Sequence, residues 1–114
     1  MQAVAVPDLL LDSLSRELDR ASRYGHELTL VVLLEAAELE PLAAQYCRAS
    51  DLKGASGDDL AVALLEADRH VGARYLRRLR SQLGVEFAAG CAHYPSDADT
   101  AAELLSRASA SARS

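Results

Sequence analysis

The chain has 114 residues, which is enough for one domain with a buried core and too few for a second domain. Half of the residues are hydrophobic, with one Phe and no Trp, so the core is expected to be aliphatic. A formal net charge of -5 argues against a nucleic-acid backbone as the main partner, because such binding depends on neutralising phosphates with Lys and Arg.

The sequence contains no signal for export or for a membrane. No run approaches the roughly 18 apolar residues of a membrane span, and the N-terminus lacks a basic region followed by an apolar core. Cys47 and Cys91 have no CxxC spacing and are expected to be reduced thiols. We therefore expect a cytoplasmic protein without a membrane span.

The first part of the chain predicts a helix and then a central strand. From Pro7 to Tyr24, apolar residues recur at helical spacing and charged residues fill the other face. Residues 28–34 form a continuous apolar run, which is typical of a strand covered on both faces. Glu35 follows and places a carboxylate at the end of this strand.

A helix from Ala36 to Arg48 is expected next, and a hairpin follows it. Residues 48–63 read RASDLKGASGDDLAVA, a polar run with glycines that leads directly into apolar residues, and this pattern predicts strand, turn and strand. The bend carries two adjacent carboxylates, Asp58 and Asp59, and hard cations such as Mg²⁺ take oxygen ligands of this kind. The alternative is an ordinary polar turn.

The last part of the chain predicts helix, strand and helix. Asp68 is expected to cap a helix that carries four arginines, Arg74, Arg77, Arg78 and Arg80. Val85 to Ala92 predicts a strand, in which Gly90 indicates close packing by a helix. Either Asp99 or Thr100 caps the final helix, and the Ser and Ala tail is expected to fray. The complete order indicates one α+β domain on an antiparallel or mixed sheet.

Three segments together resemble a known family. Residues 23–39 read RYGHELTLVVLLEAAEL, residues 56–66 read SGDDLAVALLE, and residues 87–112 read FAAGCAHYPSDADTAAELLSRASASA. In this order they resemble GGDEF domains, the diguanylate cyclases that make cyclic di-GMP from two GTP molecules. The resemblance implies that residues 1–114 form one truncated, degenerate domain with a ferredoxin-like, polymerase-palm sandwich, in which helices flank a mostly antiparallel sheet. The signature remnant would lie at a sheet edge, and it consists of Ser56, Gly57, Asp58, Asp59 and Leu60.

Departures from the family pattern imply a catalytically inactive member. Glu35 and Asp58 match two Mg²⁺ carboxylates of a working cyclase and would form a vestigial site, so no cofactor is expected. Ala37 replaces a further strand-end Asp, and Leu60 replaces the signature Phe. The family's guanine-binding segment is missing after the first strand, and the chain stops before the family's phosphate-binding Lys. Without groups that hold the base and the triphosphate, the attacking hydroxyl and the triphosphate are not oriented for in-line attack.

The resemblance also implies a ligand site. Arg48-Ala49-Ser50-Asp51 matches the RxxD motif with which many cyclases bind cyclic di-GMP, and Arg78 falls at the position of a second Arg of that site. Arg binds phosphate and guanine edges in a bidentate manner, and Asp can accept from guanine N–H groups. The family usually has five residues between Asp51 and the signature, whereas this chain has only residues 52–55. The alternative is a solvated cap and ion pair at a helix-to-strand junction.

Three functions follow from these observations. The leading hypothesis is an inactive GGDEF-like signalling domain of bacteria that binds cyclic di-GMP through Arg48, Asp51 and Arg78. The first alternative is a protein-interaction module that needs no nucleotide and binds a protein partner. The second is residual Mg²⁺-dependent nucleotide turnover on Glu35 and Asp58. A homodimer is compatible with the first hypothesis, because a bivalent dinucleotide can cross-link two copies.

Overall fold

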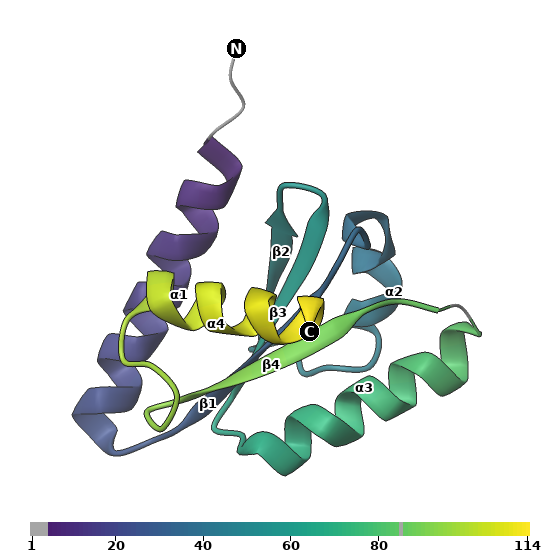
Figure 1. The fold of residues 1–114 in the computed structure, drawn as a ribbon. Coiled ribbons are helices and arrows are strands. Elements are labelled where there is room, and N and C mark those ends of the chain that lie inside the picture. Colours follow the sequence, from purple (N-terminus) through teal and green to yellow (C-terminus); the bar gives the residue numbers. More distant parts are fainter. Residues whose placement is uncertain (1–4, 85) are drawn as a thin grey trace.

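The computed structural model of the protein describes residues 5–84 and 86–114. Figure 1 shows one twisted sheet with helices on both of its faces. The elements in chain order are α1 (Ala5–Tyr24), β1 (Leu28–Leu33), the 3-10 helix η1 (Ala37–Leu39), α2 (Glu40–Ala44), β2 (Leu52–Ser56), β3 (Asp59–Leu65), α3 (Arg69–Leu83), β4 (Ala89–Tyr94) and α4 (Ala101–Arg113). Within the described ranges, no helix is both long enough and apolar enough to cross a membrane.

The sheet confirms the predicted α+β sandwich. Its strand order is β2-β3-β1-β4, and every pair of neighbours is antiparallel. All six residues of β1 are buried, as expected for a strand covered on both faces. β2 is an edge strand, so the hairpin that carries the signature remnant lies at one edge of the sheet, as the resemblance implied.

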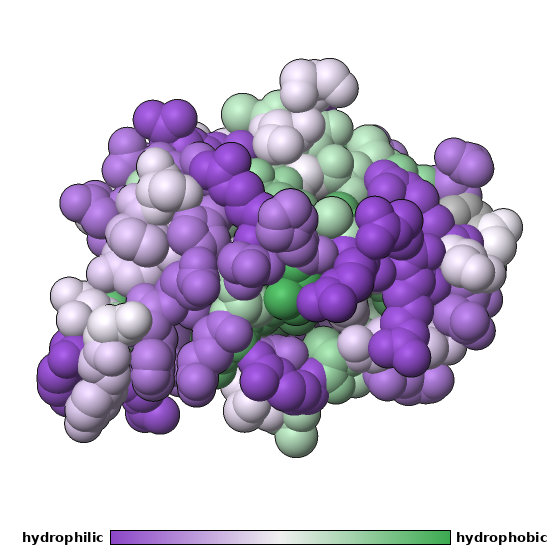
Figure 2. Space-filling model, turned by 90° about the horizontal axis from the view of Figure 1, so that it is seen from below, coloured by the Kyte–Doolittle hydropathy of each residue, from purple (hydrophilic) through white to green (hydrophobic). Residues whose placement is uncertain are grey.

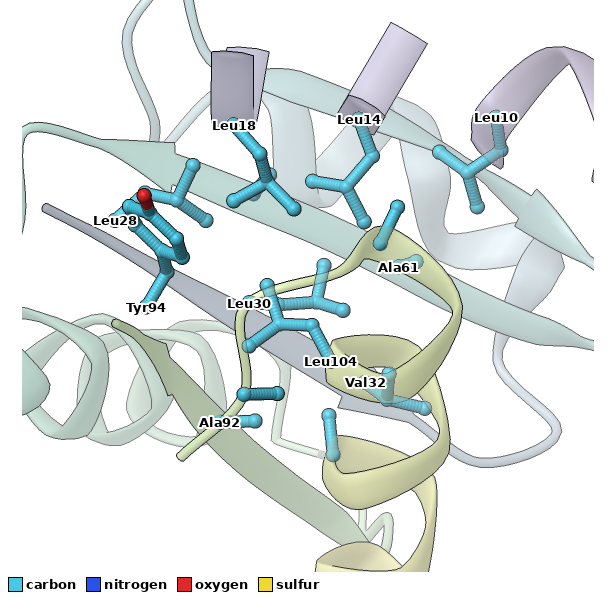
Figure 3. Close-up of a cluster of buried hydrophobic side chains, with 14 of the residues drawn as sticks. Leu10, Leu14, Leu18, Leu28, Leu30, Val32, Ala61, Ala92, Tyr94 and Leu104 are labelled. Atoms are coloured by element: carbon cyan, nitrogen blue, oxygen red, sulfur yellow. The ribbon is translucent and has the colours of Figure 1, made fainter. Parts of the chain in front are cut away.

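Alternation along β1 divides the interior into two cores, because successive side chains of a strand point to opposite faces. Leu28, Leu30 and Val32 belong to the core beneath α1 and α4, which Figure 3 shows. Val31 and Leu33 belong to the second core, beneath α3 and the η1–α2 segment. Both cores are mainly aliphatic, as the composition indicated.

α4 packs against β4 at unusually close range. A Cβ atom at Gly90 would lie 2.3 Å from the backbone nitrogen of Ala112 and 2.6 Å from the carbonyl oxygen of Ala108. This contact confirms the prediction that Gly90 marks close packing by a helix. The predicted fraying of the tail is wrong, because α4 continues to Arg113 and both alanines are buried against the sheet.

Two predicted boundaries are also wrong. The helix expected from Ala36 to Arg48 ends at Ala44, and the following residues turn because the Asp51 carboxylate accepts the Arg48 N–H at 2.9 Å. β4 begins at Ala89, which pairs with Leu33, the last residue of β1. Val85, where the strand was expected to begin, lies outside the described residues.

Side chains cap α3 and α4, the helices that precede and follow β4 in the sequence. The Asp68 carboxylate accepts the Val71 N–H at 3.1 Å, which confirms the predicted cap of α3, and this bond lowers the pKa of Asp68. Thr100, rather than Asp99, caps α4, because its Oγ1 accepts the Glu103 N–H at 3.2 Å.

Thr100→Ala is expected to lower the free energy of unfolding by about 1 kcal/mol, the usual cost of losing a side-chain cap. Asp99→Ala is the matched control, and it should change that free energy by less than about 0.5 kcal/mol because Asp99 is exposed. Urea unfolding measures this free energy in both variants. Equal losses in the two variants would contradict the assignment of the cap to Thr100.

Candidate functional site

A groove of about 960 Å³ lies between α3 and residues 45–51, which join α2 to β2. Its floor is apolar and is formed by Leu64, Ala67, Val71 and Tyr75. Its rim is charged and includes Arg48, Glu66, Arg74 and Arg78. Seen from below, with α3 toward the viewer, the surface is largely hydrophilic, and hydrophobic atoms are visible in a hollow between the polar side chains (Figure 2).

The structure brings the three predicted ligand residues together. Arg48 and Asp51 belong to the turn before β2, Arg78 belongs to α3, and all three line the groove. These residues come together because β2 lies beside β3 at the sheet edge. After β3, the chain turns back along the sheet as α3. The shorter spacing to the signature therefore does not carry Arg48 away from Arg78.

Asp51 is a buried carboxylate with several protein partners. Its side chain is 2% exposed. Oδ2 accepts the Arg48 N–H at 2.9 Å, and Oδ1 accepts the Leu65 N–H at 3.0 Å. The Lys53 ammonium donates to the Asp51 carbonyl at 2.8 Å. Asp51 thus connects the turn to the end of β3. The cap and ion pair of the alternative interpretation are present, but the carboxylate that forms them is buried rather than solvated.

Arg48 is held by one of its terminal nitrogens. Nη2 lies 3.4 Å from Asp51 Oδ1 and also donates to the Leu65 carbonyl oxygen. A guanidinium has five N–H donors, and those on Nε and Nη1 have no protein acceptor among the described residues. The side chain is 60% exposed, so these donors are available to a ligand from a fixed position.

Two further side chains of the groove were not predicted from the sequence. Arg74 lies one helical turn before Arg78, and residues at this spacing share a helix face. The Tyr46 ring lies beneath Arg78, whose guanidinium carbon is 6.0 Å from the ring centroid. The helical spacing was a usable signal for Arg74, whereas nothing in the sequence places Tyr46 opposite α3.

The charge of the groove comes from its arginines. Burial raises the pKa of the Cys47 thiol, and it raises the pKa of the Tyr75 hydroxyl much further, so both groups are neutral at pH 7. The Tyr75 hydroxyl donates to the Ala43 carbonyl at 2.9 Å. Three guanidinium groups therefore face one exposed carboxylate, Glu66, in a protein whose formal net charge is -5.

The signature remnant forms a tight turn outside this groove. Gly57 has φ +64°, a conformation that glycine adopts without strain, which confirms the predicted turn, and Leu60 is fully buried. Asp59 Oδ1 accepts the Glu35 N–H at 2.8 Å, whereas the side chains of Glu35 and Asp58 are exposed. In the described part of the chain, no three His, Cys, Asp or Glu side chains gather as metal ligands. Vestigial Mg²⁺ binding by Glu35 and Asp58 stays a prediction.

The chain is similar to known proteins in its structure. No family model and no curated protein matches its sequence. Its structure is similar to the GGDEF domain of YfiN from Pseudomonas aeruginosa, with a TM-score of 0.79 and 21% identity over 93% of this chain and 86% of the other. The fold is that of a GGDEF domain. This result confirms the architecture that the sequence resemblance implied.

Two other solved structures show the same GGDEF-like fold. A sensory box/GGDEF family protein from Caulobacter crescentus has a TM-score of 0.73 and 19% identity, with 91% of this chain and 87% of the other covered. A DGC protein from Thermotoga maritima has a TM-score of 0.76 and 15% identity, with 91% and 92% covered. The common property is the fold, since the identities are low.

Proposed function

We propose that this protein is a bacterial signalling domain that binds cyclic di-GMP in the groove between α3 and residues 45–51 and does not synthesise it. The main support for this proposal is the position of Arg48 and Arg78. These residues are distant in the sequence, and both line one groove with an apolar floor. The GGDEF-like fold supports the choice of ligand, because this fold is shared with a DGC protein.

The chemistry of the groove suits a cyclic dinucleotide. The ligand has two phosphodiester groups and two guanine bases, and Arg side chains form bidentate, charge-assisted hydrogen bonds with phosphate. The apolar floor can cover a base. The volume of about 960 Å³ lies at the upper end of the usual range for small-molecule sites. Asp51 contributes by fixing Arg48 rather than by offering a free carboxylate.

The proposed lack of synthesis rests on the connection after β1. The short elements η1 and α2 occupy it, and Ala37 stands where a working cyclase has a second strand-end carboxylate. Phosphoryl transfer depends on groups that position the triphosphate and the attacking hydroxyl. We expect no cyclic di-GMP when the protein is incubated with GTP and Mg²⁺. Synthesis that is lost in Asp58→Ala would overturn this part of the proposal.

Isothermal titration with cyclic di-GMP at physiological salt tests the binding site. Arg48→Ala and Arg78→Ala should each weaken binding by about tenfold or more, the effect of losing a hydrogen bond between charged groups. Arg77→Ala is the matched control, because Arg77 is exposed on α3 outside the groove, and it should change the Kd by less than about twofold.

The titration also separates the receptor from the alternative function. Saturable binding at micromolar Kd or tighter, weakened by both groove variants and not by Arg77→Ala, supports the receptor. No heat up to millimolar ligand would overturn the receptor and leave a protein-interaction module as the remaining hypothesis.

A further inference from the structure

We infer that Tyr46 and Arg74 determine which ligand the groove accepts: the Tyr46 ring stacks on one base, and Arg74 joins Arg78 to bind the phosphate opposite Arg48. This inference rests on the proposed function and concerns the same groove. It assigns roles to two residues that lie outside the RxxD motif.

Tyr46 is placed to act as a stacking surface. Its side chain is half-buried, and the ring packs partly against the core beneath α3 while also lining the groove. Packing of this kind fixes the ring before a ligand arrives. The cation of Arg78 lies 6.0 Å from the ring centroid, so an aromatic face and a phosphate-binding group are neighbours. A planar base adjacent to a phosphate matches this pair.

Tyr75, the other tyrosine of the groove, cannot take this role. It is only 5% exposed, and its hydroxyl is bonded to the Ala43 carbonyl. Its ring is part of the groove floor and is not a free surface on which a base could stack.

Arg74 adds a second guanidinium to the α3 wall. It is exposed, lines the groove and shares a helix face with Arg78, while Arg48 belongs to the turn that forms the other wall. In a cyclic dinucleotide the two phosphodiesters lie on opposite sides of the sugar–phosphate ring. One wall can therefore contact each phosphodiester, with Arg48 on one side and Arg74 and Arg78 on the other.

The experiment compares two probes, cyclic di-GMP and inorganic pyrophosphate, by titration. Tyr46→Leu should weaken cyclic di-GMP binding at least about fivefold, because base–aromatic stacking is lost, and should change pyrophosphate binding less than about twofold. Arg74→Gln should weaken cyclic di-GMP binding about tenfold, with Arg77→Gln as the matched control. Thermal unfolding of each variant verifies that it is folded.

Tyrosine emission provides a second readout that does not require Tyr46→Leu to fold. The chain has four Tyr and no Trp, so its emission reports tyrosine. Cyclic di-GMP should quench this emission in the unmodified protein. Tyr46→Phe should keep the Kd within about threefold, because the ring remains, while most of the quenching disappears.

Each outcome has a distinct meaning. Loss of affinity for cyclic di-GMP alone, together with the loss of quenching in Tyr46→Phe, supports the inference. If Tyr46→Leu binds cyclic di-GMP as well as the unmodified protein does, or loses both probes equally, the stacking role is wrong and the proposed receptor remains. If Arg74→Gln binds like Arg77→Gln, the role of Arg74 is wrong. If the unmodified protein does not bind cyclic di-GMP, the proposed function and this inference both fail.

Discussion

Gly90→Ala is expected to lower the free energy of unfolding by about 3 kcal/mol or more, at the upper end of the usual cost of overpacking a core. The new methyl group would lie 2.3 Å from the Ala112 nitrogen and 2.6 Å from the Ala108 oxygen. Both atoms belong to the backbone of α4, so no side chain can rotate away, and the helix itself must move off β4. Leu104 of α4, whose side chain is fully buried in the core between this helix and the sheet, would lose contacts when it does.

Gly54→Ala is the matched control for this substitution. Gly54 also lies in a strand, but the nearest atom to its added Cβ is the flexible end of Leu10, at 3.7 Å, an ordinary contact distance. Urea unfolding should show a change of less than about 0.5 kcal/mol for this variant. A loss in Gly90→Ala no larger than that in Gly54→Ala would show that α4 does not approach β4 as closely as described.

Asp51→Ala is expected to lower the free energy of unfolding by about 3 kcal/mol. Its carboxylate accepts hydrogen bonds from the backbone N–H groups of Arg48 and Leu65, and each partly buried donor left without an acceptor costs about 1–3 kcal/mol. The Arg48 guanidinium also loses an anchor. The free energy of unfolding of Asp51→Asn should lie between those of Asp51→Ala and the unmodified protein, since the amide retains one oxygen acceptor.

Two controls define the role of Asp51. Asp12→Ala removes an exposed carboxylate from α1 and should change stability by less than about 0.5 kcal/mol in urea unfolding. In the Arg48→Ala background, Asp51→Ala should still be destabilising, because both backbone donors remain. A loss similar to that of Asp12→Ala would contradict a structural role for the buried carboxylate.

The same substitution has a consequence for the proposed receptor. Because Asp51 fixes the guanidinium of Arg48, Asp51→Ala should weaken cyclic di-GMP binding by about tenfold even though Asp51 offers the ligand no free oxygen. The Arg48→Ala background distinguishes an indirect effect from a direct contact. If Asp51→Ala weakens binding equally in that background, the carboxylate itself contacts the ligand.

Much of the fold was predictable because it follows from local patterns. The apolar run of β1 indicated burial on both faces, and Gly57 indicated the hairpin turn, since its φ of +64° is unfavourable for other residues. Asp68 was identified as a helix cap because a short acceptor side chain satisfies free N–H groups of the first turn. Each of these signals depends only on neighbours in the sequence.

Predictions failed where residues distant in the sequence decide the structure. Helix propensity favoured a helix up to Arg48, but the Asp51 carboxylate stabilises a turn there by also accepting the Leu65 N–H. The small residues of the tail were expected to fray, but they permit the close approach of α4 to the strand that contains Gly90. In both cases the stabilising contact joins residues that are at least 14 positions apart in the sequence.

The order of elements, the α+β class and the resemblance to GGDEF domains could all be predicted from the sequence, because periodicity, turn residues and motif spacing are local properties. The sequence also identified Arg48 and Arg78 as candidates. The groove that these two share with Arg74 and Tyr46, and the burial of Asp51, depend on tertiary contacts and could not be predicted from the sequence. The reason is physical: sheet pairing and helix packing set the distances between remote residues, and burial of a carboxylate depends on which backbone donors the fold brings to it.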